Sequence, residues 1–119
     1  MLSKKYRLKK ADIEMLKKSG LRIKSKNFSL LVTESKTDLP TRFAFVISSK
    51  VSKLATKRNK IKRMISSSIE KIYKQLKPGM SILFLVRKEI GSTDQDTINA
   101  EVLRVFQYNK LIWKKFWFL

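Results

Sequence analysis

Apolar residues recur every three or four positions in three parts of the chain, which is the spacing of one face of an α-helix. The first part spans 12–18 and the second spans 57–76, where a Lys-Pro-Gly turn ends it. The third part spans 94–116. We therefore predict three helices, of which the second and third are long.

Three shorter runs are almost wholly apolar and indicate strands. They span 28–33, 42–49 and 81–87. Because the run 42–49 is apolar on both faces for most of its length, we predict that it is a central strand. Together these elements predict a single compact α+β domain over residues 1–119, with helices packed against one small sheet. The central strand–helix–strand unit predicts a crossover between parallel strands, which is normally right-handed.

The charge of the chain points to the kind of partner it binds. Lys and Arg number 28 against 9 acidic residues, which gives a net charge of +19. A small domain with this excess repels itself, and the excess usually serves binding to a polyanion such as RNA, DNA or an anionic membrane. We therefore expect a polyanionic partner.

The composition fits catalysis by protein side chains poorly. The chain has no Cys and no His, so it lacks thiolate metal ligands, the commonest zinc ligand and the commonest general base. Asp94 and Asp96 are the one acidic pair with a suitable spacing, but they precede Thr97 and an apolar-periodic run, which favours a helix start. We predict no catalytic residue, no protein metal site and a cytoplasmic location.

Two terminal segments bear on membranes. The first ten residues, MLSKKYRLKK, are basic and lack the apolar centre of a signal peptide, and the longest apolar run, 82–86, is too short to span a bilayer. The tail 111–119, LIWKKFWFL, places Trp and Phe around two lysines, a pattern that also occurs at membrane surfaces. We favour the simpler interpretation that this tail ends the last helix and packs on the domain, and we predict no membrane partner.

The central helix has two different faces. At 100° per residue, one stripe should pack on the sheet and consists of Ile61, Ile65, Ile69, Ile72 and Leu76. The opposite side carries Asn59, Lys62, Arg63, Ser66 and Ser67, with Lys60 at its edge. The predicted solvent face is therefore cationic near its start and small and hydroxylated further along.

The start of this helix carries the wrong charge for its dipole. Thr56 would be a suitable N-cap. An N-terminus has unpaired N–H groups and a partial positive charge, yet its first two turns contain Lys57, Arg58, Lys60, Lys62 and Arg63. All of these features favour a docked anion, and a phosphodiester backbone is the natural candidate. Asn59 adds a donor and an acceptor for a 2′-hydroxyl or a base edge; the alternative is an ordinary solvated basic face.

The same stretch resembles the signature of the protein subunit of bacterial ribonuclease P. That family has a Ser-Lys-Lys-like strand end, a small spacer and an Arg-Asn-Arg-x-Lys-Arg helix, and the matching residues here are 49–53, Ala55 and 58–63. Lys60 and Ser66 stand where the family commonly has Arg. Further segments are similar to the family, in the same order, over roughly residues 5 to 110. They are 6–10 with Asp12-Ile13, Gly20 followed by Phe28, Arg42 with 43–48, and Val86-Arg87-Lys88.

The resemblance implies a fold of order αβββαβα with a left-handed central crossover. It implies a protein that assists a catalytic RNA in removing the 5′ leader from precursor tRNA, with Mg²⁺ held chiefly by the RNA. The implied partners are the ribonuclease P RNA and precursor tRNA, with no further protein partner required. A basic structural RNA-binding protein of the ribosomal type is the alternative, but it would not need the spacing of residues 49–63.

The resemblance also assigns two binding surfaces. The RNA-subunit surface comprises Lys50, Lys53, Arg58, Asn59, Lys60, Lys62 and Arg63. The leader surface, in a cleft between the first helix and the sheet, comprises Arg7, Ile13, Lys17, Phe28, Leu31, Arg87 and Lys88. The family's aromatic cleft positions fall on Ile13, Lys17 and Leu31, and Phe28 alone remains aromatic. We therefore expect charge to contribute more than base stacking in this cleft.

Overall fold

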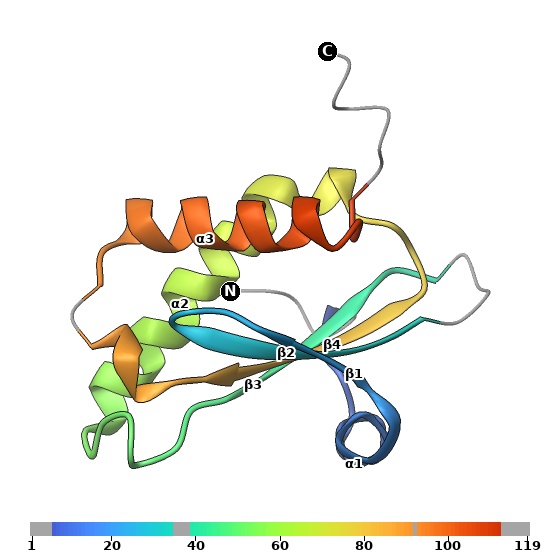
Figure 1. The fold of residues 1–119 in the computed structure, drawn as a ribbon. Helices are drawn as coiled ribbons and strands as arrows, with labels where there is room; N and C mark the ends of the chain where they lie inside the picture. Colours follow the sequence, from blue (N-terminus) through green and yellow to red (C-terminus); the bar gives the residue numbers. More distant parts are fainter. Residues whose placement is uncertain (1–5, 35–38, 92, 113–119) are drawn as a thin grey trace.

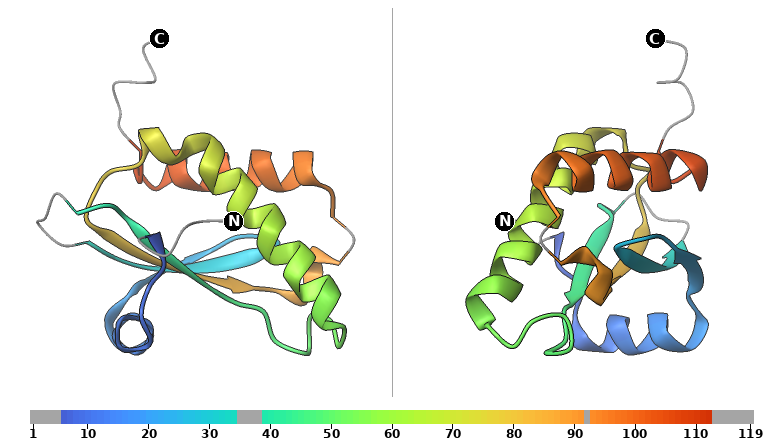
Figure 2. Two further views of the ribbon diagram at one scale, coloured as in Figure 1. Left: turned by 180° about the vertical axis from the view of Figure 1, so that it is seen from behind. Right: turned by 60° about the vertical axis from the view of Figure 1, so that its left-hand side comes forward.

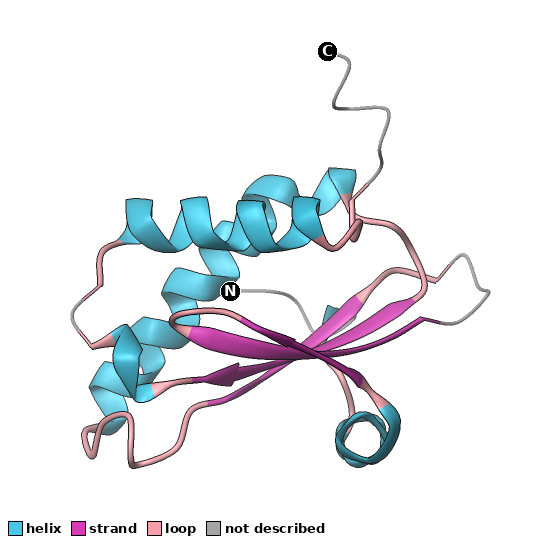
Figure 3. Cartoon of the chain, in the orientation of Figure 1, coloured by secondary structure: helices cyan, strands magenta, loops and turns pink. Residues whose placement is uncertain are grey.

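A sheet between two layers of helix forms the core of the computed structural model, which describes residues 6–34, 39–91 and 93–112 (Figures 1 and 3). The elements are α1 (Lys10–Ser19), β1 (Leu21–Lys24), β2 (Phe28–Glu34), β3 (Arg42–Val46), α2 (Ala55–Ile72), β4 (Met80–Val86) and α3 (Gln95–Tyr108). Two short 3₁₀ turns, η2 (Tyr73–Gln75) and η3 (Lys88–Ile90), follow α2 and β4. This is the order that the resemblance implies.

The strands form one mixed sheet of order β1-β2-β4-β3. β2 pairs antiparallel with both β1 and β4, whereas β3 pairs parallel with β4. The unit β3–α2–β4 is therefore the predicted parallel crossover, and its hand stays a prediction. The prediction that β3 is central is wrong, because β3 is an edge strand. It is apolar on both faces because helices cover both sides of the sheet.

The free edge of β3 is partly covered by the segment before α1. Arg7 forms a parallel bridge with Phe43, and the Leu8 N–H donates to the Phe43 carbonyl oxygen at 2.8 Å. α1 is tied to the same strand, because Arg42 lies 3.6 Å from the Asp12 carboxylate. Asp12 also accepts the Lys9 backbone N–H at the start of α1. These contacts fix α1 across one face of the sheet.

Two hydrophobic cores lie on the two faces of the sheet. Figure 2 shows α2 and α3 crossing on one face and α1 on the other. The larger core, under α2 and α3, contains Phe28, Phe84, Phe106 and Ile65, all fully buried. The smaller core, under α1, contains Leu16, Leu31 and Leu83. Alternation along β2 therefore sends Phe28 and Leu31 to opposite faces.

The apolar stripe predicted for the central helix is confirmed, but the ends of the long helices differ from the prediction. All five residues of the stripe are buried, yet α2 ends at Ile72 and Leu76 lies beyond it. α3 begins as predicted at Asp94, its N-cap, but stops at Tyr108. The predicted continuation is wrong up to residue 112, and 113–119 lie outside the described residues.

A Schellman-type cap explains where α3 stops. Lys110 adopts a positive φ of 59°. Its N–H donates to the Gln107 carbonyl at 3.1 Å, and the Leu111 N–H donates to the Phe106 carbonyl at 2.9 Å. Leu111 and Ile112 are then buried, and Ile112 bridges to Leu76. The chain thus turns back onto the domain at this point.

Candidate nucleic-acid interface

The start of α2 has no internal cap. Its N-cap residue is Leu54, so the prediction of Thr56 as N-cap is wrong, and in the described part of the chain no side chain caps this helix. The first turn has no acidic residue. The Ser52 hydroxyl accepts the Leu54 N–H at 3.2 Å, which orders the chain just before the helix. The first turn of α2 therefore keeps unpaired donors at its positive dipole end.

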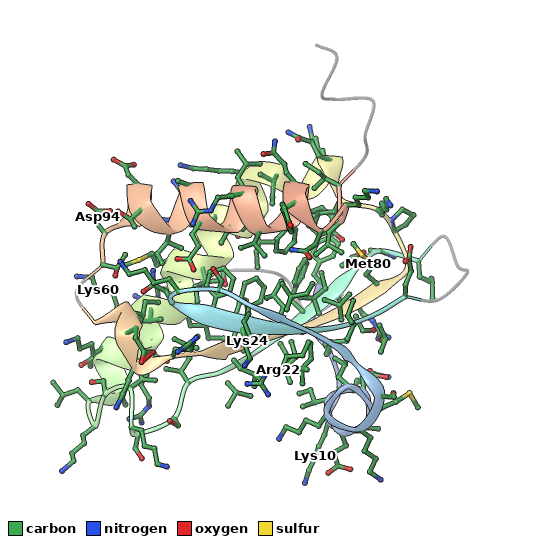
Figure 4. The ribbon with its side chains drawn as sticks, viewed as in Figure 1. Lys10, Arg22, Lys24, Lys60, Met80 and Asp94 are labelled. Carbon is green, nitrogen blue, oxygen red and sulfur yellow. The ribbon has the colours of Figure 1, made fainter. Side chains whose placement is uncertain are left out.

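The cations of this helix start differ in how they are held. The Arg58 guanidinium donates to the Ser52 carbonyl oxygen at 2.7 Å, so this side chain anchors the preceding connection. Lys50, Lys53, Asn59, Lys60 and Arg63 are exposed, and Lys62 is half-buried. Lys60 and Arg63 also line an open hollow of about 600 Å³ together with Ser67 and Asp94. Figure 4 labels Lys60 and Asp94 on the same side of the molecule. The predicted RNA-subunit residues thus lie on one end of α2 and the loop before it.

One residue predicted for the solvent face of α2 is placed differently. Ser66 is 1% exposed, so its prediction as a solvent-facing serine is wrong. Its hydroxyl has no hydrogen-bond partner in the described part of the chain. It lines a cavity of about 160 Å³ at the edge of β3, together with Arg7 and Lys62. Arg7, which was assigned to the leader surface, therefore lies beside α2 rather than beside α1.

The leader surface is brought together only in part. Ile13 and Leu31 pack in the small core under α1, and Lys17 is exposed on the same helix. Phe28 belongs to the opposite face of the sheet, is fully buried and lies 5.2 Å from the Phe84 ring, centroid to centroid. Its assignment to the leader surface is wrong for this structure, because a buried ring on the far face cannot stack on a leader base.

A cationic groove lies on the α1 face of the sheet. Its residues are Arg22 and Lys24 of β1, Ser29 of β2, Leu85 and Val86 of β4, and Arg87, and they enclose about 390 Å³. Figure 4 places Arg22 and Lys24 on the same side of the sheet as α1. We call this set the β1–β4 groove. Its wall of guanidinium and ammonium groups suits a single-stranded polyanion.

Arg87 is held in place within the β1–β4 groove. Its guanidinium donates to the Ser25 carbonyl oxygen at 3.1 Å and to the Glu89 carboxylate at 3.1 Å. The pKa of Glu89 lies below its usual range, because the Glu89 backbone N–H donates a hydrogen bond to the carboxylate and because the positive charge of Arg87 lies close to it. The neighbouring Lys88 is exposed. Arg87 therefore presents a fixed cation at the mouth of the groove.

Sequence reasoning missed Arg22 and Lys24. Both belong to β1, a four-residue strand that the apolar pattern did not reveal. The signal was nevertheless present, because Leu21-Arg22-Ile23-Lys24 alternates apolar and basic residues. Period-two alternation in a strand places both cations on one face.

Within residues 6–34, 39–91 and 93–112, no three His, Cys, Asp or Glu side chains gather in a way that could hold a metal ion. No helix of this part of the chain is long and apolar enough to cross a bilayer.

Comparison with known proteins decides the family. The family model described as Ribonuclease P matches residues 2–110. The chain belongs to this family. The ribonuclease P protein component of Synechocystis sp. is 35% identical over 112 residues, which are 93% of this chain and 90% of the relative. That of Pseudanabaena sp. is 33% identical over 113 residues, 94% of this chain and 97% of the relative.

The ribonuclease P fold is also seen in solved structures. The Staphylococcus aureus RNase P protein matches this structure with a TM-score of 0.80 at 24% identity, and the match covers 90% of this chain and 97% of that one. The predicted resemblance and the α+β single-domain fold are therefore confirmed. This member of the family carries two separate cationic surfaces, the start of α2 and the β1–β4 groove.

Proposed function

We propose that this protein is the subunit of ribonuclease P that assists a catalytic RNA in removing the 5′ leader from precursor tRNA. Family membership supports the assignment to ribonuclease P over a ribosomal-type structural protein. The RNA supplies the reactive site and holds the Mg²⁺ ions, while the protein binds RNA through charge. The absence of His and Cys from the sequence agrees with this division of labour, which would operate in the cytoplasm.

The start of α2 is the docking surface for the RNA subunit. The single observation that carries this proposal is a long helix whose first turns hold cations, no acid and no internal cap. Unpaired N–H groups, the helix dipole and the side-chain charges then act together on a phosphate. The contact residues are Lys50, Lys53, Arg58, Asn59, Lys60, Lys62 and Arg63, of which Arg58 also orders the preceding loop.

The α1 face of the sheet binds the single-stranded leader. The β1–β4 groove supplies cations, and two exposed lysines add charge: Lys17 of α1 and Lys88, which directly follows Arg87. Ile13 and Leu31 support α1 from the small core. Arg7 lies at the β3 edge beside Lys62 and Ser66, so it contacts a leader that continues from the α1 face onto that edge. Because no exposed ring lines the groove in the described residues, leader affinity here depends on charge more than on stacking.

A reconstitution experiment tests the proposed function. The purified protein is added to a bacterial ribonuclease P RNA, and cleavage of precursor tRNA is followed across a Mg²⁺ series. The protein should lower the Mg²⁺ concentration that cleavage requires, and the protein without RNA should not cleave at any Mg²⁺ concentration. Cleavage by nuclease-clean protein alone, or no effect of the protein on the RNA, would contradict the proposal.

A further inference from the structure

One acidic side chain is buried among the described residues. Glu101 of α3 is 3% exposed. Its carboxylate accepts the Asn27 backbone N–H at 3.0 Å, the Asn27 side-chain Nδ2 at 2.6 Å and the Ser25 hydroxyl. A buried charge is costly unless donors saturate it, and here one turn supplies three donors.

The turn that Glu101 holds is not self-sufficient. Ser25 N–H donates to the Phe28 carbonyl at 2.9 Å, so Lys26 and Asn27 form a two-residue connection between β1 and β2. The favoured two-residue hairpin turns need a positive φ at one or both positions. Neither Lys26 nor Asn27 has a positive φ. The carboxylate from α3 therefore supplies order that the turn residues do not supply themselves.

The same turn fixes Arg87. The Ser25 carbonyl oxygen accepts from the Arg87 guanidinium at 3.1 Å, and the Arg87 backbone N–H donates to the Asn27 carbonyl at 2.9 Å. A continuous chain of contacts thus runs from Glu101 through residues 25–27 to a cation of the β1–β4 groove. Lys24, which precedes the turn directly, lines the same groove.

We propose that Glu101 is a positioning residue for the β1–β4 groove: it holds the turn 25–27 so that this turn orients Arg87 and Lys24 toward a single-stranded leader. This inference rests on the proposed leader-binding function of the groove. Glu101 touches no RNA in this arrangement, and it acts through the turn alone. An acid at this place in a chain of net charge +19 therefore strengthens anion binding, although its own charge opposes it.

The test measures the leader advantage, defined as the affinity of the reconstituted holoenzyme for precursor tRNA divided by its affinity for leaderless tRNA. The variants are Glu101→Gln, Arg87→Ala, their double variant and Ser25→Ala. Asp96→Asn is the matched control, because it removes one negative charge from an exposed position of the same helix. Glu101→Gln should lower the leader advantage roughly 3- to 10-fold, the effect of misplacing one charged contact.

The pattern across the variants separates positioning from general stability. The double variant should lose no more than Arg87→Ala alone, and Asp96→Asn should lose nothing. Affinity for leaderless tRNA and for the RNA subunit should stay unchanged in all variants. If Glu101→Gln does not fold, folded Ser25→Ala should still show a smaller loss of leader advantage, because it removes one of the three donors.

The contrary results form two groups: those that overturn only the positioning role and the one that also overturns the leader contact. An effective Arg87→Ala with an ineffective Glu101→Gln would overturn the positioning role and leave the leader groove intact. The positioning role would also be overturned by losses that multiply in the double variant, by equal losses for leaderless tRNA, or by a folded Ser25→Ala that keeps the full advantage. An ineffective Arg87→Ala would overturn the proposed leader contact itself, and the positioning role with it.

Discussion

The first turns of α2 and α3 differ in whether a side chain of the protein accepts their N–H groups. At α3 the Asp94 carboxylate accepts the Thr97 N–H at 2.8 Å, and Asp96 places a second acid in the first turn. At α2 the N-cap is Leu54, which has no polar side chain, and cations replace the acids. Both helices pack one apolar face against the same side of the sheet. Their packing therefore does not explain why one start carries acids and the other carries cations.

The difference shows that the protein itself caps the start of α3, whereas it does not cap the start of α2, where we propose that a partner docks. An internal acid completes the start of α3, so this end has no need of an external anion. The start of α2 keeps both its backbone donors and its side-chain cations available. The contrast therefore supports our proposal that the start of α2 is the docking end, and this support does not depend on the total charge of the chain.

The largest expected effect comes from removing cations at the start of α2. The double variant Lys62→Ala/Arg63→Ala should weaken binding to the RNA subunit roughly tenfold or more, because two charged contacts are lost. Each lost phosphate contact should also flatten the log–log salt dependence of affinity by roughly 0.7–0.9. Filter binding across a salt series measures both quantities. Lys71→Ala, at the exposed far end of α2, is the control and should change neither.

A second prediction makes α2 resemble α3. Leu54→Asp places an internal acceptor at the N-cap, where 65% of the leucine is exposed. The free protein should become more stable by about 0.5–2 kcal/mol, and affinity for the RNA subunit should fall, because the added carboxylate occupies the donors and repels phosphate. Urea unfolding and RNA binding report the two effects. A more stable protein with full RNA affinity would show that the helix end is not used.

A third prediction asks whether the second cationic surface also works through charge. Lys17→Ala should reduce the leader advantage of the holoenzyme, and the reduction should shrink at high salt because salt screens charge. Phe28→Leu should leave the leader advantage unchanged and lower the free energy of unfolding by about 1–2 kcal/mol, because the ring is buried in the core. A leader advantage insensitive to salt and to Lys17, yet lost with Phe28, would restore stacking as the main effect.

The smallest effect is expected at the start of α3. Asp94→Ala should lower stability and leave RNA affinity unchanged. The hydrogen bonds from Thr97 hold the pKa of Asp94 below its usual range. The stability that Asp94 contributes is therefore fully present at pH values above the ordinary carboxyl pKa. It is lost as the pH falls through the lower pKa that Asp94 has in the folded protein. The difference in urea midpoint between Asp94→Ala and the unsubstituted protein should be present at neutral pH and disappear in acid.

Local patterns were enough to predict the centre of the molecule. The apolar stripe of α2, the three longer strands and the start of α3 at Asp94 all follow from spacing within one element. The basic helix start was visible for the same reason. Features that depend on contacts between distant residues were not accessible in this way.

Long-range contacts explain some of the wrong predictions, and local backbone geometry explains the others. The odd spacing of Phe28 and Leu31 in one strand already places them on opposite faces, and only the face that α1 covers depends on long-range contacts. β3 looks central because α1 and residues 6–8 shield it, although it lies at an edge. α3 stops where Lys110 adopts a positive φ, a conformation usually taken there by Gly or Asn. The Glu101 contacts join residues 74 and 76 positions apart.

The most direct measurement compares the two helix starts in the assembled complex. The chain has no Cys, so Thr56→Cys at the start of α2 and Thr97→Cys at the start of α3 each give a single attachment site for a hydroxyl-radical probe. Both threonines are exposed and lie in the first turns of their helices. We expect cleavage of the RNA subunit at a small set of nucleotides from position 56 and little from position 97. Equal cleavage from both positions, or cleavage from position 97 alone, would contradict it.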